Sequence, residues 1–175
     1  AQAVLPAINR GEPAAGAAVY HGELLPGGGL ALRMGQRTFR FNSAFSYPHA
    51  GFHHLVAGTA NPDSRKSWRV EVDAKANRVI AQCDDYRVER TVKFEKTRVE
   101  IADAVTNLHQ DAPLGMAVRH EMELGGLGSP QIRLAGNPDP TVNEYYAPGN
   151  PSVHVRLKNS GIGIIAEDDV LRNQA

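Results

Sequence analysis

Three of the seven histidines stand close together in the first third of the chain, and their imidazoles could hold a metal ion or a ligand. His49, His53 and His54 lie within residues 47–55, which also contain a proline and a glycine. A zinc site needs three or four nitrogen, sulfur or oxygen ligands. The proline and the glycine oppose a helix that would bring these side chains together, and no nearby carboxylate completes the set. We therefore expect no metal, and a loop over a sheet from which His49 and His53 contact a ligand.

A fourth histidine interrupts an apolar strand face. Strand alternation across residues 114–124 puts His120 on the same face as Met116 and Met122, and Glu121 on the other. Imidazole titrates near neutral pH, which suits acid–base chemistry. Two interpretations of His120 are open: a ligand-binding side chain on a concave sheet, or a core histidine that is hydrogen-bonded to a neighbour.

Two tyrosines are candidates for stacking against a ligand. Tyr145 and Tyr146 lie in the proline-rich residues 125–151, which we expect to form a long loop. Either tyrosine could contact a sugar or hold the loop against the sheet. Trp68 is expected to belong to the core, because Val70 shares its strand face. Ligand contacts are therefore expected on residues 47–55, on residues 125–151 and on the face that bears His120.

Strand patterns run through the rest of the chain and must position these side chains. Apolar alternation or hairpin spacing predicts strands at residues 18–24, 30–34, 38–45, 68–73, 78–83, 153–157 and 162–166. No segment has the apolar periodicity of an amphipathic helix, and 17 glycines and 11 prolines disfavour helices further. We predict an all-β fold, an antiparallel β-sandwich of ten or more strands.

The best-defined element is a hairpin of residues 86–95 and 98–107. One register sets Val92 against Ile101 on the apolar face and Lys93 against Glu100 on the polar face. The same register places the two polar interruptions of the apolar face, Arg90 and Asp103, opposite each other. These agreements predict an antiparallel hairpin with Arg90 beside Asp103 on its inner face, partly buried.

Composition limits the class of function. The 175 residues suit a single domain spanning residues 1–175, and Lys plus Arg equals Asp plus Glu at 19 each. Nucleic-acid binding usually needs a basic excess, and a membrane helix needs a long apolar run that the chain lacks. The triplet Gly27-Gly28-Gly29 lacks the lysine and following helix of a phosphate-binding loop, so no cofactor is expected. The single cysteine leaves the redox compartment open.

The hairpin and the strand after it resemble a known family. The segment that begins Tyr86-Arg-Val-Glu-Arg, the Asp103-Ala-Val-Thr-Asn ending and the apolar alternation up to His120 are similar to the galactose-mutarotase-like β-supersandwich. That superfamily includes aldose epimerases and the sandwich domains attached to glycoside hydrolases and polysaccharide lyases. The resemblance covers about 40 of the 175 residues. It implies a compact version of this sandwich or a piece of a larger carbohydrate-active protein, in an extracellular or periplasmic setting.

The resemblance implies carbohydrate as the partner and leaves three functions open. The favoured one is an accessory sandwich domain that supports or extends a glycan site, with other domains or further copies of the chain as neighbours. The second is a sugar epimerase or lyase-like enzyme, in which His120 would act with a glutamate as the family's histidines do. The epimerases' Asn-x-x-Tyr-Phe-type segment is not evident, which favours the first. The third is a structural or oligomerisation module with an exposed sheet edge.

Overall fold

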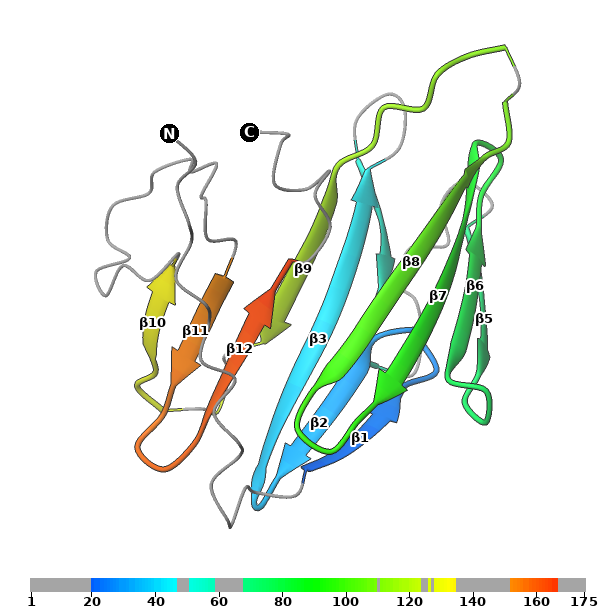
Figure 1. The fold of residues 1–175 in the computed structure, drawn as a ribbon. Helices are drawn as coiled ribbons and strands as arrows, with labels where there is room; N and C mark the ends of the chain where they lie inside the picture. Colours follow the sequence, from blue (N-terminus) through cyan, green and yellow to red (C-terminus); the bar gives the residue numbers. More distant parts are fainter. Residues whose placement is uncertain are drawn as a thin grey trace, which may run out of the picture. The chain divides into compact units, whose positions relative to one another are not determined.

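The computed structural model describes residues 20–46, 51–58, 68–109, 111–123, 126, 128–134 and 152–166. Twelve strands and no helix occur in these residues, and every strand pair is antiparallel, which confirms the all-β antiparallel sandwich (Figure 1). Residue contacts divide the chain into two compact units, residues 1–123 and 124–175. The expectation of a single domain stays a prediction.

The first sheet of unit 1 is organised around one long strand. Its members are β1 (Tyr20–Leu24), β2 (Leu30–Met34), β3 (Arg37–Ser46), β4 (Phe52–Leu55) and β9 (Val118–Glu123). Phe41 of β3 pairs with both Leu30 of β2 and Met122 of β9, so β2 and β9 lie on opposite edges of β3 (Figure 1). β4 pairs with the later residues of β3 on the same edge as β2. β3 therefore carries two short strands in succession on one edge and β9 on the other.

The second sheet is a meander in chain order. It contains β5 (Arg69–Asp73), β6 (Arg78–Gln82), β7 (Tyr86–Phe94) and β8 (Val99–Asn107). The predicted hairpin is confirmed in register: Val92 pairs with Ile101, and Arg90 pairs with Asp103. Trp68, just before β5, is 7% exposed and belongs to the core, as expected.

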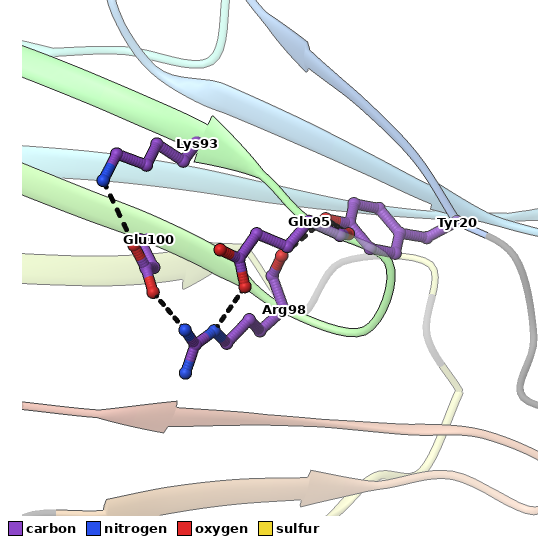
Figure 2. A network of polar contacts seen from close by, with 5 residues as sticks. All are labelled: Tyr20, Lys93, Glu95, Arg98 and Glu100. Carbon is purple, nitrogen blue, oxygen red and sulfur yellow. Dashed lines mark hydrogen bonds and ion pairs between the residues drawn. The ribbon is translucent and has the colours of Figure 1, made fainter. Parts of the chain in front are cut away.

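The apolar faces of the two sheets pack against each other. Phe45 from the first sheet and Val79 and Val88 from the second are almost completely buried in one cluster. The Tyr20 hydroxyl reinforces the contact at one end, because its single proton lies between two acceptors, the backbone carbonyls of Glu95 and Arg98 in the β7–β8 turn. Figure 2 shows Tyr20 beside this turn, next to the ion pairs that cover the outer side of the hairpin.

The three consecutive glycines allow the β1–β2 connection to lie directly against the chain that follows β4. The amides of Gly27 and Gly29 donate to the carbonyls of Gly58 and Val56, at 3.0 Å each, and the Val56 amide donates back to Gly27. Gly28 has a φ of +80°, a backbone conformation that favours glycine. The glycines therefore serve close backbone packing.

Unit 2 is a three-stranded antiparallel sheet of β10 (Gln131–Leu134), β11 (Ser152–Arg156) and β12 (Gly161–Ile165). The predicted β11–β12 hairpin is confirmed. The expectation of an uninterrupted loop over residues 125–151 was wrong, because β10 forms within it and pairs with β11. The alternation of Ile132 with charged or polar neighbours was too short to stand out among the surrounding prolines.

Two further expectations about unit 1 need correction. Residues 52–55 form β4 and not part of a loop, because Leu55 and His53 face the core opposite Ser43 and Phe45. The strand expected at residues 114–124 begins only at Val118. Ala117 still exchanges hydrogen bonds with Ser46, so the chain approaches β3 one residue before the strand begins.

Candidate functional site

A row of polar side chains crosses the interior of unit 1 and joins its two sheets. Arg90 is 1% exposed. Its Nε and Nη2 atoms donate to the two carboxylate oxygens of Asp103, each at 2.7 Å. Nη2 also donates to Ser43 Oγ, across the sandwich, at 2.9 Å. A two-point arginine–carboxylate contact fixes the guanidinium plane and stabilises a charge that would otherwise be costly to bury.

His120 ends the row on the first sheet. Its Nδ1 atom lies 3.0 Å from Ser43 Oγ, on the neighbouring strand. Arginine has no acceptor, so Ser43 accepts from Arg90 and its own hydroxyl proton is free to donate to Nδ1. This order of donors places the proton of neutral His120 on Nε2. The row therefore runs from Asp103 on β8 through Arg90 and Ser43 to a histidine whose Nε2–H is a hydrogen-bond donor.

The surroundings of His120 disfavour its protonated form. His120 is exposed, yet the protein atoms around its ring desolvate it in part, and this effect lowers its pKa. The positive charge of Arg90 lowers the pKa further, while Asp103 acts in the opposite direction. The imidazole is thus held in the neutral form that the hydrogen bond from Ser43 requires.

We expect this pKa shift to make folding weaker in acid. The unfolded chain binds a proton at the ordinary histidine pKa, about 6.5, whereas the folded chain binds it only at lower pH. The free energy of unfolding should therefore fall as the pH decreases through about 6.5, and this contribution should be absent in His120→Asn. Urea unfolding at about pH 7.5 and pH 5.5, with an NMR titration of His120, measures both effects. An equal pH dependence in the two proteins would contradict the expectation.

The row opens to solvent at the strands β8 and β9. Each of them pairs with one neighbour among the described strands, so each is an edge of its sheet. Ile101 and Val105, which flank Asp103 on the inner side of β8, are 41% and 42% exposed, whereas Val92 on the neighbouring strand β7 is buried. The open side of the sandwich therefore combines apolar side chains with a carboxylate and an imidazole.

This arrangement suits binding better than acid–base catalysis. Both carboxylate oxygens of Asp103 accept hydrogen bonds from Arg90, so this carboxylate is engaged in a structural contact. Glu123 on β9 is turned to the outer face of the sheet, where it accepts a hydrogen bond from Asn42. Within the described residues, no free carboxylate accompanies His120 on the inner face.

His53 takes a different place from the one expected of it. It is 1% exposed in the core, stacked on Trp68 with ring centroids 4.5 Å apart. Its Nδ1 lies 2.9 Å from the Tyr86 hydroxyl. The expectation of a surface-loop histidine was wrong, because alternation in β4 turns His53 inward. The structure therefore does not bring His53 and His120 to one accessible surface.

The other expected ligand contacts, His49, Tyr145 and Tyr146, lie outside the described residues. Within the described ranges, no group of three or more potential metal ligands occurs, and no helix could span a bilayer. Sequence reasoning did not predict that Ser43 links Arg90 to His120. The available signal was that Ser43 interrupts the apolar face of Phe39, Phe41 and Phe45.

Comparisons with known proteins give no relative. No family model, curated protein or solved structure matches the chain. The resemblance to the galactose-mutarotase-like sandwich therefore stays a prediction.

Proposed function

We propose that this chain is an accessory β-sandwich domain of a carbohydrate-active protein, and that a glycan binds on the side edged by β8 and β9. The observation that carries the proposal is the polar row, which ends in His120 at one side and at the other in Asp103, flanked by the exposed Ile101 and Val105. A sugar ring presents C–H groups on its faces and hydroxyl groups at its rim. It needs apolar contact together with a few placed donors and acceptors.

The polar row would serve such a ligand through its two ends. His120 offers an Nε2–H donor, and Asp103 retains acceptor capacity besides its two bonds from Arg90. Arg90 and Ser43 are buried and hold these groups in place without touching the ligand. The domain would thus support or extend a glycan site without breaking a bond.

The test is NMR shift mapping of the isotope-labelled chain with a panel of neutral oligosaccharides. We expect shifts at Ile101, Val105 and His120, and an affinity about tenfold lower in His120→Ala, the loss of one hydrogen bond. Ala104→Ser, on the opposite face of β8, is the matched control and should bind normally. Shifts clustered on Arg69, Glu71, Lys93 and Glu100, or none with any glycan, would overturn the proposal.

A second candidate is assembly through the edge of β8. Ile101 and Val105 on this strand and Leu108 just after it are all about two-fifths exposed, and an unpaired strand edge can pair with another chain. Sedimentation over a range of protein concentrations distinguishes the two functions. A dimer that dissociates in Ile101→Lys would favour assembly, and a monomer at all concentrations would exclude it.

A further inference from the structure

A hollow of about 400 Å³ lies on the outer face of the first sheet, away from the polar row. Strand register places its lining in two rows across β1, β2 and β3. Ala31 and Ala57, which are each 5% exposed, contribute small side chains to the lining. The two rows are His21–Arg33–Thr38 and Glu23–Ala31–Arg40.

The two arginines of the hollow are diagonal neighbours on adjacent strands. Arg33 lies opposite Thr38, and Arg40 lies opposite Ala31. These two cross-strand pairs are two residues apart along each strand, so they are successive pairs on the same face of the sheet. Both arginines are exposed, and neither forms an ion pair with any residue in the described part of the chain. Glu23 is the one acidic residue among those that line the hollow. The lining residues therefore carry a net positive charge, and Glu123, which lies opposite Arg40 on β9, is outside the lining and accepts a hydrogen bond from Asn42.

On the outer face of the second sheet, four cationic side chains form ion pairs with glutamates. Lys93 and Arg98 both form ion pairs with Glu100, and Arg98 also pairs with Glu95 (Figure 2). Arg78 and Arg87 both pair with Glu89. Four cations of the second sheet are thus neutralised by neighbouring carboxylates, whereas the two arginines of the hollow are not, as far as the described residues extend.

An anion would complete this arrangement. A guanidinium donates two parallel hydrogen bonds to a carboxylate or sulfate, and two guanidinium groups around one hollow can hold the same anion from two sides. The Thr38 hydroxyl, beside Arg33, supplies a further donor. Like charges on neighbouring strands repel, so a bound anion would also relieve their repulsion.

We propose that this hollow binds the anionic group, a carboxylate or a sulfate ester, of an acidic saccharide. The saccharide part rests on the proposed function, whereas the anion part rests on Arg33, Arg40 and the hollow itself. A glycan chain could then contact the domain on two faces, with a neutral portion at β8 and β9 and an acidic residue here.

The test compares binding of a galacturonic acid trisaccharide with that of the neutral galactose trisaccharide and of inorganic sulfate. We expect the acidic trisaccharide to shift the amide signals of Arg33, Thr38 and Arg40, and to bind more weakly as salt increases. Arg33→Gln and Arg40→Gln should each reduce its affinity at least tenfold. Arg69→Gln removes an exposed strand arginine from the second sheet and should change the affinity less than twofold.

The outcomes separate this inference from the proposed function. If neutral glycans bind at β8 and β9 but the acidic trisaccharide leaves the hollow unshifted, the inference is overturned and the proposed function stands. If the acidic trisaccharide binds in the hollow and neutral glycans bind nowhere, the inference stands and the β8–β9 site is overturned. If inorganic sulfate binds as tightly as the trisaccharide, the hollow is a simple anion site, and the saccharide part is overturned.

Discussion

Asp103→Ala is expected to lower the free energy of unfolding by about 3–5 kcal/mol, the range found when one partner of a buried ion pair is removed. Arg90 would keep its charge at 1% exposure and retain only Ser43 as a hydrogen-bond acceptor among the contacts described. Urea unfolding of the purified chain measures the loss. The size of the effect follows from the burial of Arg90, since Asp103 itself lies closer to solvent.

The control for this change lies on the same two strands. Lys93 and Glu100 form an exposed pair on the outer face of the hairpin, and Glu100→Ala should cost at most about 1 kcal/mol. The double change Arg90→Met with Asp103→Leu removes both charges and should recover most of the stability lost in Asp103→Ala. A loss below about 1 kcal/mol in Asp103→Ala would show that Arg90 is not the buried cation described above.

Gly29→Ala should destabilise the fold by about 3 kcal/mol, the upper end of the usual range for overpacking. A Cβ atom at this position would lie 2.4 Å from the Ala57 nitrogen and 2.7 Å from the Phe41 carbonyl oxygen. These are backbone atoms of the neighbouring chain and of β3, so they can move away only if hydrogen bonds are broken. Thermal and urea unfolding measure the loss.

Gly115→Ala is the matched control, because nothing lies within 4 Å of the Cβ position there. It should change the free energy of unfolding by no more than about 0.5 kcal/mol. Equal stability in the two variants would mean that the β1–β2 connection does not pack against Val56 and Ala57 as described.

Local pairing could be predicted from the sequence, and long-range pairing could not. The β7–β8 register followed from residues less than twenty positions apart, because apolar, charged and interrupting residues all agreed on one alignment. The pairing of β9 with β3 joins residues such as Ser43 and His120, which are 77 positions apart. Alternation within a strand shows which side chains share a face, but it does not indicate which strand pairs with it. Short strands such as β4 and β10 carried too few alternating residues to be recognised.

The candidate site was predictable only in part, for the same reason. Alternation indicated that His120 and Arg90 interrupt apolar faces, but not that Ser43 bridges them across two sheets. Arg33 and Arg40 read as ordinary polar-face residues of two strands. Only the register of β1, β2 and β3 shows that they border one hollow.

The pairing of β9 with β3 also sets an order in which unit 1 can be completed during synthesis. In the second sheet, each of the strands β6, β7 and β8 pairs with the strand just before it in the chain, so that sheet can form as soon as its residues emerge. The edge of β3 that β9 will occupy remains open until Glu123 has been made. Until β9 pairs there, Ser43 lacks its hydrogen bond with His120. An open strand edge pairs readily with other chains. A nascent chain released before this point would therefore expose an additional strand edge that is prone to aggregation, and the last strand of the unit covers that edge.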